Sequence, residues 1–198
     1  MNRDNYRIKE NTSRGLTLAE VVISVALLSL VGIAIATFGA NVFSQNRFLS
    51  NRLSAEQEGQ SALNKFSAEI RSASISSGGA YPIAAAGTSS ITFFTDVDNN
   101  GTKEQVRYFL NATTTLMRGV ITPSGNPLVY TSGGETFTQV IHNVSNGTST
   151  DLFSYYDSNY DGTTSALTSP ISVVNVRLIK ITVKIDVDTK KSPVPLTL

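Results

Sequence analysis

The strongest constraint on the fold of this 198-residue chain is a stretch from Val21 to Asn46 that contains no charged residue. Its apolar part, Val21 to Phe43, reaches the ~20 residues that a helix needs to cross a hydrocarbon core of ~30 Å. Glu20 comes directly before this part. An ionised side chain within a membrane span costs roughly 2.5 to 3.5 kcal/mol on insertion scales, so it is usually kept because it has a partner. An amino group is the expected partner.

The segment before the apolar stretch is polar and mostly basic. Its charged residues are Arg3, Asp4, Arg7, Lys9, Glu10 and Arg14. Residues 1–15 are therefore interpreted as a leader rather than a fold element. By the positive-inside rule the leader stays on the cytoplasmic side, which predicts that everything after Arg47 is exported.

The run Arg14-Gly15-Leu16-Thr17-Leu18-Ala19-Glu20, followed by a long apolar helix, resembles the class III signal of type IV prepilins and of the pseudopilins of type II secretion systems. In that family a prepilin peptidase cuts after the glycine and methylates the new N-terminus, and the mature subunits assemble into a filament. The resemblance implies a cut between Gly15 and Leu16 and makes Glu20 the assembly glutamate. Leu16 stands where the family usually has phenylalanine.

The resemblance also implies a location and a set of partners. The chain is expected in the bacterial inner membrane as a single-pass protein with an exported head. Its expected partners are the prepilin peptidase, the assembly platform and other pilins or pseudopilins. The length and the order of elements look like a minor pseudopilin of the J type or a minor pilin of the W type.

Two other interpretations of the apolar stretch remain open. An ordinary secretory signal would use Ala34-Ile35-Ala36 as its cleavage site and leave Thr37 as the new N-terminus. A plain single-pass anchor would hold an exported binding or adhesion domain on a helical stalk. Both leave Gly15 and Glu20 without an explanation.

The helix is predicted to continue beyond the membrane. Apolar residues recur on one expected face, which also carries Glu56 and Gln60: Leu49, Leu53, Leu63, Phe66, Ile70 and Ala73. Gly32, Gly39 and Gly59 are candidate bends or close-packing points. A helix from Thr17 to about Ser74 would be roughly 85 Å long. Because a small domain cannot cover that length, the N-terminal half needs lipid or other copies of itself.

The rest of the chain predicts strands. Paired glycines and a proline in 76–82 end the helix. Strand-like runs follow at Ile91–Thr95, Gln105–Leu110, Thr115–Val120, Thr136–Val144, Leu152–Tyr156 and Val173–Val187. The first two flank 96–104 and predict a hairpin. In the last, the apolar face changes phase near Leu178 and Ile179, which predicts a bulge or strong twist, and this strand is expected to pack across the helix.

These elements together predict an α+β, pilin-like fold: a long N-terminal helix, transmembrane in its N-terminal half, packed against an antiparallel sheet domain. The expected organisation is a leader at 1–15, a transmembrane assembly helix at 16–45, an amphipathic continuation at 46–76 and an exported β-rich head at 77–198. A cut before Leu16 would place a new α-amino group one helical turn before Glu20. In staggered parallel helices the carboxylate of one subunit could then meet the ammonium of its neighbour, and breaking such a buried pair costs roughly 3 to 5 kcal/mol. The pair would set the register of the filament.

Two segments fit the opening of a calcium loop, D-x-[DN]-x-[DN]-G. The candidate ligands are Asp96, Asp98 and Asn100 in the first segment and Asp157, Asn159 and Asp161 in the second. The twelfth position, where a bidentate glutamate should close the site, is Arg107 or Thr168. Since tight turns select the same residues, turns are favoured over calcium, and no other cofactor is expected.

Composition excludes several classes of chemistry. There is no cysteine, so disulfides and thiolate metal sites are impossible. His142 is the only histidine and lies in a strand-like run, which favours a structural role and predicts that the chain is not an enzyme. A net charge of +1 without a basic run predicts no direct nucleic-acid contact. The tyrosines at 155, 156 and 160 are interpreted as half-buried sheet residues rather than a binding patch.

Overall fold

The computed structural model describes residues 15–111, 114–147, 149–188 and 195–198. Of the leader predicted over 1–15, only Gly15 is among these, and residues 1–14 lie outside the described part. The contacts divide the chain into two units, residues 1–47 and 48–198. The apolar stretch thus belongs entirely to the first unit, and all the described strands belong to the second.

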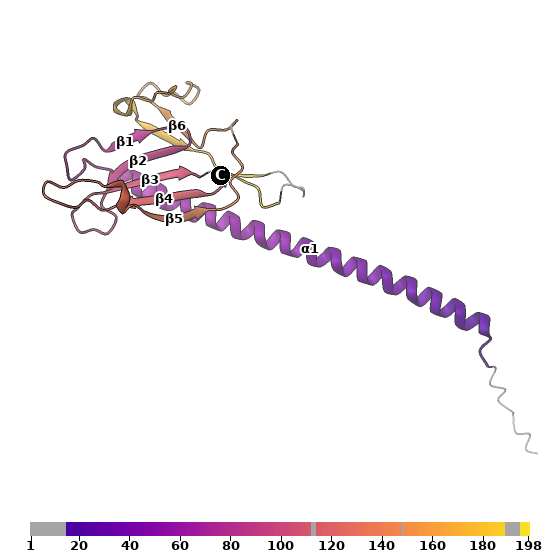
Figure 1. Ribbon diagram of the computed structural model, residues 1–198. Helices are drawn as coiled ribbons and strands as arrows, with labels where there is room; N and C mark the ends of the chain where they lie inside the picture. The colour runs from indigo at the N-terminus through magenta and orange to yellow at the C-terminus, as the bar shows by residue number, and fades with distance from the viewer. Residues whose placement is uncertain (1–14, 112–113, 148, 189–194) are drawn as a thin grey trace, which may run out of the picture. The chain divides into compact units, whose positions relative to one another are not determined.

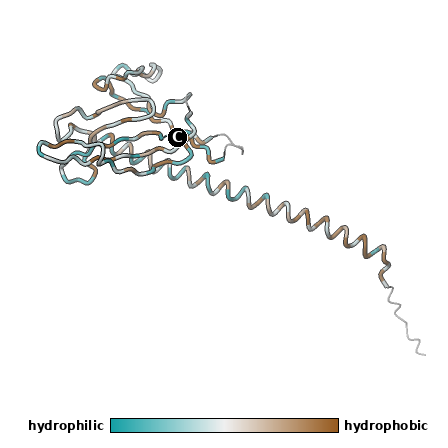
Figure 2. The backbone as a smooth tube through the Cα atoms, in the orientation of Figure 1, coloured by the Kyte–Doolittle hydropathy of each residue, from teal (hydrophilic) through white to brown (hydrophobic). Residues whose placement is uncertain are grey.

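One helix, α1 (Leu18–Arg71), contributes to both units. Hydrophobic residues predominate along its first half and polar residues become frequent further along (Figure 2). The helix ends at Arg71, slightly before the predicted end near Ser74. The Ser72 amide donates to the Ala68 carbonyl at 3.2 Å, and its hydroxyl donates to the carbonyls of Ala68 and Glu69 at 3.1 and 3.0 Å. The side chain of Ser72 thus supplies a donor to the Glu69 carbonyl in the last turn, where helical donors run out.

An antiparallel five-stranded sheet forms the main layer of the second unit (Figure 1). The strands lie in chain order: β1 (Ile83–Ala86), β2 (Ser90–Thr95), β3 (Glu104–Leu110), β4 (Leu116–Ile121) and β5 (Thr136–Ile141). The predicted hairpin is confirmed, since β2 pairs with β3 and Thr95 lies opposite Glu104. Strand β1 was not predicted, because an alanine run carries no β-branched or alternating signal.

The prediction of one long strand over Val173–Val187 is wrong. This segment forms a short 3-10 helix η2 (Val173–Asn175) and two strands, β7 (Leu178–Ile181) and β8 (Lys184–Ile185). β7 pairs with β6 (Phe153–Tyr156), and β8 pairs with β9 (Leu196–Thr197). The phase change near Leu178 and Ile179 falls where β7 begins, and the break between the two small sheets lies further along, at Thr182 and Val183. A second 3-10 helix, η1 (Ser132–Gly134), precedes β5.

The core of the second unit lies between the last turns of α1 and one face of the five-stranded sheet. The ring of Phe66 packs edge-on against Tyr108 and Phe93, with centroids 5.1 and 6.3 Å away, and lies 5.6 Å from Phe153. Such aromatic contacts add about 0.5–1.5 kcal/mol each beyond the area they bury. Phe66 therefore ties α1 to three strands, β2, β3 and β6.

The helix face that packs on this core matches the predicted one only in part. Phe66 is buried, and Leu63, Ile70 and Ala73 pack against the core as predicted. The buried residues of α1 are Ala55, Gly59, Ala62 and Phe66, whereas Leu49 and Leu53 are exposed. At 100° per residue, Leu53 lies about 140° around the helix from Phe66, so the two cannot share a face. A side chain at Gly59 would meet Leu198 and Ile185, which explains why this face is built of small residues. The expectation of close packing at Gly59 is confirmed.

A buried ion pair crosses the same helix–sheet interface. Glu69 on α1 accepts hydrogen bonds from Arg118 Nε and Nη2 on β4 at 3.0 and 2.7 Å, and from the Tyr108 hydroxyl on β3 at 2.8 Å. The Arg118 and Glu69 side chains are only 7% and 12% exposed. Burial, together with the charge and hydrogen bond of Glu69, raises the pKa of Tyr108 far above its ordinary value, so this tyrosine is a neutral donor. The three side chains fix the position of α1 along the sheet.

Candidate functional site

The first turn of α1 is closed by a reciprocal pair of hydrogen bonds between Thr17 and Glu20. The Glu20 amide donates to Thr17 Oγ1 at 3.3 Å, and the Thr17 amide and hydroxyl both donate to Glu20 Oε2 at 3.2 Å. This is a capping box, in which the side chains at N-cap and N3 satisfy each other's free amides. Glu20 was predicted to act only in assembly, although the T-x-x-E spacing is the signature of a capping box.

The proposed processing pair lies immediately outside this cap. Gly15 and Leu16 precede the helix and have no regular secondary structure. Leu16 is 76% exposed, and no described atom lies within 4 Å of the position that a Gly15 side chain would take. Among the described residues, nothing blocks access to the Gly15–Leu16 bond.

The apolar half of α1 is exposed throughout the first unit. Its large side chains, from Leu18 at 84% to Phe43 at 73%, are not covered by any of the described residues. This is the one described helix that is long and apolar enough to cross a membrane. Exposed apolar surface on this scale marks a lipid or protein contact.

The hydroxyl groups inside this apolar half are satisfied by the helix itself. Ser24 donates to the Glu20 carbonyl at 2.7 Å and Ser29 to the Val25 carbonyl at 2.8 Å. Thr37 donates to the carbonyls of Ile33 and Ala34, both at 3.0 Å. Because every polar group in hydrocarbon needs a partner, these bonds let the segment carry three hydroxyls without a penalty for an unpaired group.

The first of the two Asp-rich segments forms the β2–β3 turn. Asp96 accepts backbone hydrogen bonds from Asn100 at 3.1 Å and Gly101 at 2.9 Å, and Lys103 Nζ lies 3.4 Å from Asp96 Oδ2. Burial by itself would raise the pKa of Asp96, but these hydrogen bonds and the lysine charge lower it below its ordinary value. Gly101 has φ +90°, a conformation that glycine adopts without strain.

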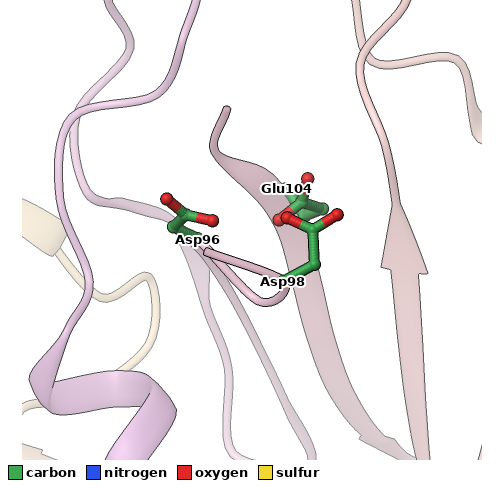
Figure 3. Close-up of side chains that lie close together, drawn as sticks. All are labelled: Asp96, Asp98 and Glu104. Atoms are coloured by element: carbon green, nitrogen blue, oxygen red, sulfur yellow. The ribbon is translucent and has the colours of Figure 1, made fainter. Parts of the chain in front are cut away.

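A third carboxylate joins this turn from the start of β3. One carboxylate oxygen from each of Asp96, Asp98 and Glu104 lies within 4.8 Å of the other two (Figure 3). Glu104 is only 2% exposed, and its Oε2 accepts from the Val97 amide at 2.9 Å. Its Oε1 is buried and accepts no hydrogen bond from a described residue. The calcium-loop motif places its closing glutamate at the twelfth position, so Glu104, the ninth residue counted from Asp96, was not predicted as a ligand.

The second Asp-rich segment has the hydrogen bonds of a turn. Asp161 Oδ1 accepts from the amides and hydroxyls of Thr163 and Thr164 at 2.7 to 2.9 Å, and these bonds hold the pKa of Asp161 well below its ordinary value. Asp157 accepts from the Asn159 amide at 2.9 Å and from its side chain at 3.2 Å. The side-chain oxygens of Asp157 and Asp161 thus cap the local backbone.

His142 lies directly after β5 and contacts α1. Its backbone amide donates to Glu58 Oε1 at 3.1 Å, ring Nδ1 lies 2.5 Å from the same oxygen, and Nε2 lies 2.8 Å from Gln139 Oε1. Both ring nitrogens are engaged by a carboxylate or an amide oxygen rather than by a nucleophile. The geometry is that of a structural histidine linking sheet and helix.

Tyr155 and Asn146 also have structural roles. Tyr155 on β6 is fully buried and its hydroxyl donates to the carbonyls of Gly87 and Ser90 at 3.0 and 3.3 Å, so it belongs to the core. Asn146 is buried as well, and its side chain donates to the Thr182 carbonyl at 2.7 Å and accepts from the Lys184 amide at 2.8 Å. Asn146 therefore holds together the break between β7 and β8.

Comparison with known proteins adds no relative. No protein-family model matches the chain, and neither a curated protein nor a solved structure matches it. The argument for function therefore depends on the residues and geometry described above.

Proposed function

We propose that this chain is a minor structural subunit of a type IV pilus or a type II secretion pseudopilus, assembled after a prepilin peptidase cuts between Gly15 and Leu16. The observation that carries the proposal is the exposed apolar half of α1, which begins with a single carboxylate at Glu20. An apolar helix that the described part of its own chain does not cover requires lipid before assembly and neighbouring helices after it. The role is structural, and no catalysed reaction is proposed.

The membrane step is supported by the chemistry of the helix. The apolar run is long enough to span, its three hydroxyls bond to their own backbone, and the residues before it carry mostly positive charge. In this proposal the helix is held in the bacterial inner membrane with the head domain exported. The partners are the prepilin peptidase, the assembly platform and other pilins or pseudopilins.

The assembly step uses the same carboxylate that caps the helix. Glu20 Oε2 accepts two hydrogen bonds from Thr17, and a carboxylate has about four lone-pair sites, so acceptor capacity remains for a neighbour's ammonium. In the filament, the new amino group at Leu16 of one subunit would meet Glu20 of the next. Because each charge is costly alone in an apolar environment and the pair is less so, the contact would select one register among staggered helices.

The decisive experiment is mass spectrometry of the mature N-terminus after co-expression with a prepilin peptidase and sister subunits. The expected product begins at a methylated Leu16. Gly15→Val should retain the leader, because a branched side chain then occupies the exposed position before the cut. Glu20→Gln is the matched control, since it keeps the cleavage site and removes only the charge.

The outcomes separate the candidate functions. A methylated Leu16 together with recovery of the chain in filaments supports the proposal. An N-terminus at Thr37 would identify an ordinary secretory signal, and an uncut leader on a chain that stays monomeric would identify a membrane-anchored binding or adhesion domain. Either of these results would refute the filament assignment.

A further inference from the structure

The β2–β3 turn brings three carboxylates together with too little positive charge. Asp96, Asp98 and Glu104 each place an oxygen within 4.8 Å of the others, and the Lys103 ammonium contacts only Asp96, at 3.4 Å. Like charges at this spacing repel each other, and the repulsion is greatest for a group that has left water. No positively charged side chain among the described residues contacts all three carboxylates, so the group as a whole favours binding of a cation.

A second observation at the same place points to a ligand. Glu104 is 2% exposed, and its Oε1 has neither solvent nor a hydrogen-bond donor among the described residues. Leaving a buried carboxylate oxygen unpaired is costly, and native structures seldom do so unless an ion, water or catalytic role accounts for it. Oε2 of the same carboxyl group is held by the Val97 amide, which fixes the orientation of the group beside Asp98.

The geometry points to a calcium site formed by Asp96, Asp98 and Glu104, and we propose that it binds Ca²⁺ and clamps the β2–β3 turn. Hard oxygen ligands from carboxylates exclude the softer metals and suit Ca²⁺, Mg²⁺ or Mn²⁺. Calcium is favoured because it accepts irregular sets of six to eight oxygens, whereas Mg²⁺ requires near-ideal octahedral geometry. Waters would supply the ligands that the exposed side of the turn leaves open.

The site differs from the loop that the sequence motif describes. In that motif the closing glutamate stands at the twelfth position, where this chain has Arg107, and Arg107 pairs with Glu135 at 2.8 Å instead. Here the closing carboxylate comes from Glu104, because the antiparallel pairing of β2 with β3 returns the chain to the start of the turn. The site rests on this geometry and is independent of filament assembly.

Thermal unfolding of the full chain in non-ionic detergent tests the proposal, with calcium chloride titrated against an EDTA-treated sample at constant ionic strength. We expect a calcium midpoint of about 10⁻⁴–10⁻³ M, the range of extracellular calcium modules. At tenfold excess over the midpoint, the unfolding temperature should rise by about 3 °C or more. Magnesium at the same concentration should give a clearly smaller shift.

Glu104→Gln and Asp98→Asn are the site variants, and Asp157→Asn in the second Asp-rich turn is the matched control. Glu104→Gln keeps an oxygen that can accept from the Val97 amide, so the turn can still form. It should weaken calcium binding at least tenfold, yet unfold in EDTA at or above the wild-type temperature, because one repelling charge is gone. Asp157→Asn should respond to calcium as the wild type does.

Four results would overturn the site. The first two are an unfolding temperature that does not change at 10 mM calcium, and one that magnesium raises as much as calcium does. The third is a Glu104→Gln variant that responds to calcium as the wild type does. The fourth is a Glu104→Gln variant that loses the same amount of stability in EDTA and in calcium. The last would mean that Glu104 serves only to hold the turn. None of these results bears on leader cleavage, so the calcium site and the filament proposal fail or stand separately.

Discussion

The buried pair between Glu69 and Arg118 makes a sharp prediction about what holds α1 on the sheet. Arg118→Met removes two hydrogen bonds of 3.0 and 2.7 Å and leaves the Glu69 carboxylate, 12% exposed, with only the Tyr108 hydroxyl. Breaking a buried pair by removing one partner costs about 3–5 kcal/mol, because the remaining charge is uncompensated. Domains of this kind are stable by about 5–15 kcal/mol, so the single variant should lose a large share of its stability.

The destabilisation caused by removing Arg118 and that caused by removing Glu69 should not be additive. Glu69→Met alone should also cost about 3–5 kcal/mol, since it strands the buried Arg118 guanidinium. In the double variant neither charge of the pair remains. The main cost is then the buried Tyr108 hydroxyl, which has lost its hydrogen-bond acceptor and destabilises the fold by about 1–3 kcal/mol. The double variant should therefore be more stable than either single one. Adding Tyr108→Phe should bring stability back toward the wild type.

Urea unfolding of the full chain in non-ionic detergent, followed by far-ultraviolet circular dichroism, measures these free energies. Glu58→Met is the matched control on the same helix. Its carboxylate pairs with His142, whose side chain is 51% exposed, so the loss should stay at or below about 1 kcal/mol. A cost below about 1 kcal/mol for Arg118→Met, or single losses that simply add in the double variant, would refute the role of the pair.

Three further predictions concern other parts of the chain. Burial raises the pKa of Tyr108 and of Tyr155. The free energy of unfolding that each neutral tyrosine contributes is therefore complete below the unfolded pKa near 10, and above it decreases by about 1.4 kcal/mol per pH unit for each. Tyr155→Phe should make the free energy of unfolding decrease less steeply between pH 10 and 12, and an unchanged slope would contradict this. Gly59→Leu should cost about 1–3 kcal/mol in urea unfolding because the side chain meets Leu198, while Gly39→Leu in the apolar half leaves the unfolding of the head unaffected. Glu20→Gln should insert and be cleaved normally yet be depleted from purified filaments, and normal incorporation would rule out its role in assembly.

The sequence predicted those features that depend on neighbours along the chain. The long helix, the β2–β3 hairpin and several strands of the main sheet follow from local periodicity and turn residues, and the structure has them at nearly the expected places. The α+β class follows from their order. The capping box at Thr17 and Glu20 was equally local, and its spacing would have revealed it.

The errors came from features that depend on distant segments. Leu49 and Leu53 were predicted on the buried face of α1, yet both are exposed, and the buried positions next to them are Ala55, Gly59 and Ala62. The C-terminal residues Ile185 and Leu198 approach Gly59 too closely for a larger side chain. One strand was predicted over 173–187, and the division of this segment between two small sheets depends on its partners at 153–156 and 196–197. A pattern of apolar residues indicates which face of an element is buried, but not which distant segment packs against that face.

The sequence by itself determined that an uncharged, apolar helix begins at one carboxylate, because length, composition and the position of Glu20 are properties of consecutive residues. Only the tertiary structure decided which charges became buried together. Glu69 and Arg118 are separated by 49 residues, and Glu104 reaches the turn through strand pairing. Electrostatic energy depends on distance in space and on exclusion of water, and both are set only when the sheet closes on the helix.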